Sequence, residues 1–444
     1  MEVMKKALSF VLSWMLGICL SAQHATLMVK SADSGTKGSI SRYSDPVVMS
    51  ELKLKEFSLT KQYQAFELEF EGEHAYFQLN AGESNAGFYL SNSDTLELDF
   101  SAREEQWKIL GGSAAILNNR LAVIDSMCDD ILLKSSLLPL SKRTKELRYF
   151  SDTLRKNSTE PSAFIRNYIQ YRTAYLEIIT DSRKRTDINL MHFSIAAQPS
   201  NMAWVESFQS LFKGYFAQKL NGRNGADLKA LMVAKDIQGI RSFMASDTSL
   251  RNADVRDLIL LLGLYNESRE KQFDKELLVQ LVSKIAESSA DGTVKLVGQI
   301  ILEDWLRYAK GRDCEDFTFG QPEKALRSLV GKPIYFCYYP VFDQDVSREI
   351  LMLKGIYAKY KSEMHFLVVV KTNAVAGLEK AISAMQPGFD VVTLSSCSSG
   401  INSLLEKEDR TTYILLDRQG KIFQAPAEGP ETGVEAAFTT LIKK

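Results

Sequence analysis

The cysteines of this 444-residue chain are the side chains best suited to covalent chemistry, but no two of them form a Cys-x-x-Cys pair. Thiol–disulfide exchange requires a thiolate that attacks sulfur through a mixed disulfide. Cys397 lies in the polar stretch 395–400 and is the candidate for a reactive thiol, whereas Cys337 lies inside an apolar run typical of a buried free thiol. Spacing alone leaves open the disulfide state of Cys128, Cys314, Cys337 and Cys397.

The other side chains that support catalysis are too dispersed to suggest a metal centre or a serine nucleophile. The four histidines are spread along the whole chain, whereas a metal site needs three or four converging ligands. No Gly-x-Ser-x-Gly surrounds the serines near Cys397, and no histidine follows them. Glycine-rich phosphate loops are absent as well. The sequence therefore predicts no metal and no cofactor.

The charge balance bears on the class of partner. Lys and Arg total 54 and Asp and Glu total 55, which gives a net charge of −1. Binding to phosphate backbones needs a concentrated positive surface, so the bulk charge excludes nucleic acid as a partner class. The chain is 45% hydrophobic and 25% charged, the composition of an ordinary folded protein.

The N-terminus has the pattern of a secretory signal peptide over residues 1–22. Lys5 and Lys6 precede the apolar run 7–20, and small residues follow it. That run is too short to span a bilayer. Cys19 raises a lipoprotein alternative, but Ile18 stands where a lipobox requires a small residue. We expect an exported protein, periplasmic, outer-membrane associated or extracellular, with no transmembrane segment after signal removal.

Three stretches of different periodicity must position these residues. Residues 23–112 alternate apolar and polar side chains, as in 65–70 and 95–100, which predicts an antiparallel β-sandwich. Residues 113–312 show apolar steps of three and four, which predict an all-helical segment with helices over 201–220, 227–244, 254–265, 274–287 and 294–308. Its aromatic stripes indicate core packing.

Residues 313–444 alternate apolar strands with amphipathic helices. Strands are expected over 333–339, 364–371, 412–416 and 420–423, and helices over 347–360, 374–385 and 433–443. Continuous β-branched runs between helices predict a sheet that is covered on both faces. The fold class expected for the whole chain is therefore multidomain α+β.

Motifs in this last stretch resemble bacterial envelope thioredoxin-like proteins of the TlpA/ResA type. The similar residues are Phe317-Thr318, Gly331-Lys332 and the turn from Asp417 through Gly420-Lys421. The resemblance implies a C-terminal thioredoxin-like α/β domain over 313–444. Upstream, the β-rich segment and its Gly-Gly-Ser junction at 111–113 resemble a β-sandwich domain of unknown function that precedes such domains in Bacteroidetes envelope proteins.

The departures from this family fall on its reaction centre. Counted from Gly331-Lys332, the dithiol motif falls on residues 343–346, so that Asp343 and Val346 stand at the cysteine positions with Gln344 and Asp345 between them. Thr411 stands at the position of the family's cis-proline. The preceding aromatic is retained as Phe342. We expect Asp343 or Asp345 to cap the following helix rather than to catalyse.

These departures predict a redox-inactive binding or scaffold module for an envelope protein or peptide. Its degenerate active-site groove would comprise Phe342, Asp343, Gln344, Asp345, Val346 and Thr411, and its oligomeric state stays open. The alternative is an atypical thiol–disulfide oxidoreductase or isomerase that uses Cys397 or Cys337. A third class, a small-molecule module in the helical segment, has no polar constellation in the sequence to favour it.

Overall fold

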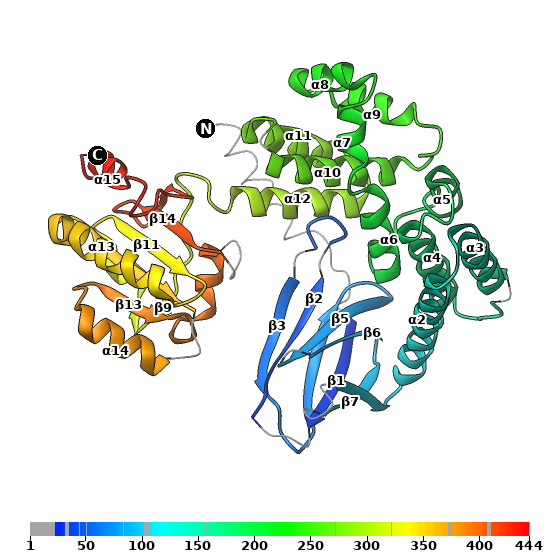
Figure 1. Cartoon of the computed structure of the whole chain (residues 1–444), viewed down its shortest axis with the longest axis horizontal. Helices are drawn as coiled ribbons and strands as arrows, with labels where there is room; N and C mark the ends of the chain where they lie inside the picture. The colour runs from blue at the N-terminus through cyan, green and yellow to red at the C-terminus, as the bar shows by residue number, and fades with distance from the viewer. Residues whose placement is uncertain are drawn as a thin grey trace. The chain divides into compact units, whose positions relative to one another are not determined.

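The computed structural model describes residues 23–31, 35–43, 45–49, 51–82, 84–101, 106–156, 158–270, 272–320, 322–371, 375–405 and 410–443. The expected signal peptide, residues 1–22, lies outside the described residues. The chain forms two compact units, of which the first ends at Ile301 and the second begins at Leu302. The fold class predicted from the sequence, multidomain α+β, is confirmed: the chain has N-terminal β-sheets, a helical middle segment and a C-terminal α/β region (Figure 1).

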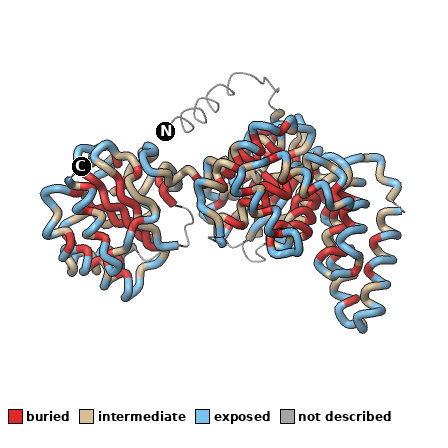
Figure 2. The backbone as a smooth tube through the Cα atoms, turned by 90° about the horizontal axis from the view of Figure 1, so that it is seen from above, coloured by how far each residue is buried: buried red, intermediate tan, exposed pale blue. Residues whose placement is uncertain are grey.

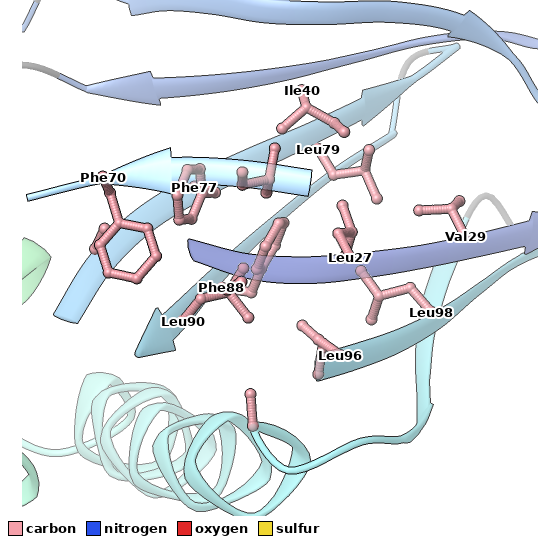
Figure 3. Close-up of a cluster of buried hydrophobic side chains, with 14 of the residues drawn as sticks. Leu27, Val29, Ile40, Phe70, Phe77, Leu79, Phe88, Leu90, Leu96 and Leu98 are labelled. Carbon is pink, nitrogen blue, oxygen red and sulfur yellow. The ribbon is translucent and has the colours of Figure 1, made fainter. Parts of the chain in front are cut away.

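The first unit begins with two facing four-stranded sheets. Alternate side chains point inward along most strands, and Figure 3 shows Leu27, Phe77 and Phe88 within the apolar core that results. Pairing is antiparallel except between the first and seventh strands, which are parallel. One sheet has the order β4 (Gln64–Phe70), β1 (Gln23–Ser31), β7 (Thr95–Ser101), β8 (Gln106–Gly111), and the other β3 (Glu51–Ser58), β2 (Lys37–Tyr43), β5 (His74–Ala81), β6 (Ser84–Ser91).

The helical segment packs against the second of these sheets within the same unit. Asn118 accepts a hydrogen bond from the backbone N–H of Tyr89 at 2.8 Å and donates one to the carbonyl of Tyr89 at 2.9 Å. The hydroxyl of Tyr89 accepts from the backbone N–H of Met202 at 2.8 Å. The helices are α2 (Ala115–Ser136), α3 (Leu140–Lys156), α4 (Ala163–Ile179), α5 (Arg185–His192), α6 (Met202–Phe212), α7 (Tyr215–Leu220), α8 (Gly225–Ala234), α9 (Ile237–Ala245), α10 (Ala253–Glu270), α11 (Lys275–Ser288) and α12 (Gly292–Leu306).

Two of the predicted helices are each divided in the structure. The helix expected over 201–220 breaks between α6 and α7, where Gly214 precedes the new helix. The helix expected over 227–244 breaks at Lys235, which adopts a left-handed conformation with φ 56°, and Asp236 then caps α9 by accepting from the N–H of Gly239. In both cases the apolar period continues across the break, so periodicity alone did not reveal it.

The second unit is built on one five-stranded sheet. Its strand order is β13-β12-β11-β14-β15. The strands β11, β12 and β13 run parallel to one another, β14 pairs antiparallel with β11, and β15 pairs antiparallel with β14. The elements are β9 (Thr318–Phe319), β10 (Lys324–Ala325), β11 (Ile334–Tyr339), α13 (Gln344–Tyr360), β12 (His365–Val370), α14 (Val375–Met385), β13 (Asp390–Thr393), β14 (Thr412–Leu416), β15 (Ile422–Gln424) and α15 (Glu435–Ile442), with short 3-10 turns at Leu326–Leu329, Leu394–Ser396 and Ser399–Leu404.

The central strand β11 separates two apolar cores. Tyr335, Cys337 and Tyr339 face the core formed with α13 and α15, and the alternate residues face the core formed with the 3-10 turns. Every residue of β11 is buried, as the continuous apolar run predicted. Figure 2 shows buried residues in the interior of the unit that carries the C-terminus, with exposed residues around them. Within the described ranges, no helix combines the length and apolar character required to cross a membrane.

Candidate functional site

The start of α13 is held by a carboxylate. Asp343 has an extended backbone (φ −134°), and its Oδ1 accepts a hydrogen bond from the N–H of Val346 at 2.9 Å. The hydroxyl of Ser347 donates to the carbonyl of Asp343 at 2.9 Å. Asp343 is therefore the N-cap, as expected for one of the two aspartates. Asp345 is exposed in the first turn and pairs with Arg348 at 3.2 Å.

The other residues predicted at this position divide between surface and core. Gln344 and Asp345 are exposed, whereas Val346 is 7% exposed and packs in the core beneath α13. Phe342 is half-buried against the same core. The accessible side chains at the start of the helix are thus those of Asp343, Gln344 and Asp345.

Thr411 is exposed and directly precedes β14. Its neighbour Thr412 pairs with Tyr338, near the carboxyl end of β11, and α13 also begins beyond that end. The topology thus brings Thr411 and residues 342–346 to the same end of the sheet. The cis-proline of this unit lies elsewhere, at the Ala425-Pro426 bond after β15.

A polar cluster that the sequence analysis missed joins α13 to strands β11 and β14. The hydroxyls of Tyr339 and Tyr413 donate to the same oxygen, Oε2 of Glu349 in α13, at 2.8 and 2.7 Å. Burial raises the pKa of both phenols, so both remain protonated donors. The alternation of Tyr335, Cys337 and Tyr339 could have placed Tyr339 on the α13 face, but Tyr413 is found only from the register of β14.

The thiols are poor candidates for nucleophiles. Cys337 is fully buried, and this burial raises its pKa well above the ordinary value. Cys397 packs against the core on the opposite face of the sheet from α13, and burial raises its pKa to about 12. All four described cysteines are free. A reactive thiol needs a lowered pKa and access, so neither environment favours thiolate chemistry, and Cys397 is not brought to the start of α13.

A metal centre finds no ligand set in the part of the chain that the structure describes. No group of three or more His, Cys, Asp or Glu side chains there is arranged to hold an ion. The accessible side chains at the start of α13 offer carboxylate and amide groups as hydrogen-bond acceptors and donors instead, and Thr411 offers a hydroxyl at the same end of the sheet.

Similarity to known proteins is confined to solved structures. No family model matches the chain, and no curated protein matches it. A thioredoxin-like protein from Bacteroides caccae is 11% identical with a TM-score of 0.35, over 56% of this chain and 94% of that one. The thioredoxin domain of a thiol-disulfide oxidoreductase from Bacteroides vulgatus is 18% identical with a TM-score of 0.26, over 30% and 98%. A thiol:disulfide interchange protein from Bacteroides sp. is 17% identical with a TM-score of 0.26, over 30% and 91%.

Proposed function

We propose that this chain is an exported, redox-inactive thioredoxin-like protein whose C-terminal unit binds an extended segment of an envelope protein or peptide. The observation that carries the proposal is the carboxylate of Asp343, hydrogen-bonded to the N–H of Val346 at the start of α13. In the proteins that this unit resembles, the attacking thiol stands at this helix start. A carboxylate has no sulfur to exchange, so the positive end of the helix holds a cap in place of a nucleophile.

The proposed binding surface combines the exposed residues Gln344, Asp345 and Thr411, with Phe342 beside them. Thr411 and the start of α13 lie at one end of the sheet, where an extended chain can contact both. The environments of Cys337 and Cys397 support the non-catalytic form of the proposal, because burial raises the pKa of both thiols.

The catalytic side of the proposal is tested with the purified mature chain in an insulin reduction assay with dithiothreitol. We expect turbidity to develop at the rate of dithiothreitol alone. Acceleration at the rate of a thioredoxin would overturn the redox-inactive assignment. Loss of such an acceleration in Cys397→Ala would establish the atypical oxidoreductase in its place.

The binding side is tested by selecting peptides against the mature chain and measuring their affinity by calorimetry. Thr411→Trp places a large side chain on the proposed surface, and we expect it to weaken binding roughly tenfold or more. Thr440→Trp is the matched control, since Thr440 is an exposed threonine on α15, whose Glu435 contacts Lys359 near the other end of α13. Equal effects of the two substitutions would remove the surface from the proposal.

Export is tested on the protein from its own cells. We expect the chain in the envelope fraction with an N-terminus near Gln23, because residues 1–22 have the pattern of a signal peptide. A chain that retains Met1 and stays with the cytoplasmic fraction would contradict this part of the proposal.

A further inference from the structure

The C-terminal end of α10 carries a buried glutamate that forms no ion pair with any residue that the structure describes. Glu267 is only 4% exposed. Among the described residues, no group donates a hydrogen bond to its carboxylate or forms an ion pair with it. Burial, with the nearby Glu270 adding to it, raises the pKa of Glu267, and Lys229 acts in the opposite direction. An ionised side chain is costly to bury unless a partner compensates it.

Glu267 lines a hollow of about 500 Å³. Glu270, one turn further along α10, lines it as well, together with Ala217 of α7 and Asn221 at the end of that helix. Lys213 contributes the one ammonium group among the described lining residues. Two carboxylates and one ammonium give these described lining residues a net charge of −1 when both glutamates are ionised.

The close packing of α7 on α10 buries Glu267. Gly263 lies one turn before Glu267, and a Cβ placed on it would stand 2.3 Å from Cβ of Phe216. Glycine therefore allows α7 to lie directly on the backbone of α10. Asn266 fixes the adjacent turn by donating to the carbonyl of Lys213 at 3.1 Å. The hollow is thus bounded by two helices in close contact.

The two carboxylates stand at the end of α10 that disfavours negative charge. Glu267 and Glu270 occupy its last turn, where the free carbonyl groups already carry partial negative charge. This end of a helix favours cations. The carbonyl dipoles and the buried carboxylate would therefore both be stabilised by a positive charge in the hollow.

We propose that this hollow binds an alkylammonium group, with Glu267 as the deep anion and Glu270 and Asn221 at its mouth. A bare Ca²⁺ or Mg²⁺ ion fits the lining less well, because these ions need about six or more oxygen ligands in close contact, whereas this hollow also presents the Lys213 ammonium and the Ala217 methyl group. The ammonium belongs to a free diamine or to a lysine side chain of a polypeptide. This site lies outside the surface proposed at α13 and does not depend on it.

Calorimetry on the full mature chain tests the site, with 1,4-diaminobutane as the probe. We expect saturable binding to the wild type and roughly tenfold or greater weakening in Glu267→Gln, the loss expected for a hydrogen bond to a charged group. Glu146→Gln removes the same charge from an exposed position on α3 and leaves the affinity unchanged. No binding at millimolar concentration, or equal binding to both variants, would overturn the proposal.

Two further arms keep the result unambiguous. Thermal unfolding tests whether Glu267→Gln is folded, and we expect 1,4-diaminobutane to raise the melting temperature of the wild type but not of this variant. Calcium chloride that binds in place of the diamine with the same dependence on Glu267 would overturn the amine assignment. The second arm uses Nα-acetyl-lysine amide, whose side-chain ammonium is free. If it binds as tightly as the diamine, the ligand is a lysine side chain of a polypeptide. If only the diamine binds, the ligand is a free diamine.

Discussion

Two glutamates are buried in the helical segment of the first unit, and they differ in whether a described cationic side chain pairs with the carboxylate. Glu177 of α4 is fully buried, and its Oε1 lies 2.7 Å from Nη2 of Arg155 and 3.0 Å from Nε of Arg183. Glu267 of α10 is nearly as buried and faces a hollow with no such partner among the described residues. The difference indicates that Glu177 has a structural role, and it supports the proposal that Glu267 binds a cationic ligand.

The surroundings of Glu177 complete this contrast. Asp152 pairs with both arginines, at 2.9 and 2.7 Å, so two cations face two anions. His192 lies beside Arg155, with 3.4 Å between Nε2 and Nη1. The network joins α3, α4 and α5 through side chains from each. A balanced set of this kind holds helices together, whereas the unbalanced set at α10 leaves one negative charge available.

Glu177→Gln should have the largest effect on stability. The substitution leaves Arg155 and Arg183 facing a neutral amide in a buried site, and breaking a buried pair in this way costs about 3–5 kcal/mol. Urea unfolding followed by circular dichroism measures the loss, with the exposed Glu146→Gln as a control that changes stability by less than about 0.5 kcal/mol. A loss below that of the control would show that Glu177 is not the centre of the network.

His192 should make the same network sensitive to acid. Burial first, and then Arg155 and Arg183, lower the pKa of His192 from 6.5 to about 3. Because the folded pKa is depressed, the unfolded chain takes up a proton that the folded chain refuses. Stability is therefore lost as pH falls from 6.5 toward 3, by up to about 1.4 kcal/mol for each pH unit.

The measurement is an NMR titration of the histidine ring signals, with His192 assigned by the signal missing in His192→Gln. We expect this signal to keep its neutral position down to pH 4. A midpoint near the ordinary value of 6.5 would mean that the ring is accessible and that the network is open to water.

Substitution of Asp343 should change stability less than Glu177→Gln and more than Glu267→Gln, because the Asp343 carboxylate is exposed but accepts a hydrogen bond from a backbone N–H. Asp343→Ala should destabilise the second unit by about 1 kcal/mol, and Asp343→Asn should retain most of the cap. Asp345→Ala is the matched control, since its exposed pair with Arg348 contributes little. Equal losses from Asp343→Ala and Asp345→Ala would contradict the cap assignment.

Glu267→Gln should have the smallest effect on stability. The direction of this effect distinguishes Glu267 from Glu177. We expect stability at pH 7 to stay within about 1 kcal/mol of the wild type or to rise, because the substitution removes an uncompensated charge. The folded pKa of Glu267 is raised, so the penalty exists above that pKa and is relieved as pH falls through it. The advantage of the variant should therefore shrink in acid. A loss of several kcal/mol at pH 7 would make Glu267 structural.

The sequence predicted the elements whose periodicity is local and uninterrupted. The run 364–371 became the buried strand β12, and the N-cap is Asp343, one of the two aspartates that counting along a resembling motif placed at the helix start. The break at Lys235 was missed, because a left-handed cap by a lysine leaves the apolar period unchanged on either side. The strand β13, Asp390–Thr393, was missed as well.

The site residues that were missed depend on contacts distant in sequence. Glu349 matters because Tyr413 is brought to it by the pairing of β14 with β11. Glu267 lies beyond residue 265, where the predicted helix ended, in a polar stretch that reads as solvated. Its burial follows from the contact of Gly263 with Phe216, which no periodicity encodes.

The placement of the free cysteines gives each unit an intrinsic reporter of its own opening. Cys128 is 3% exposed in the first unit, and Cys337 is fully buried in the central strand of the second. A thiol reagent reaches such a side chain only when the surrounding structure opens. Pulsed labelling followed by peptide mapping would therefore time the opening of the two units separately in a single native chain, with no introduced probe.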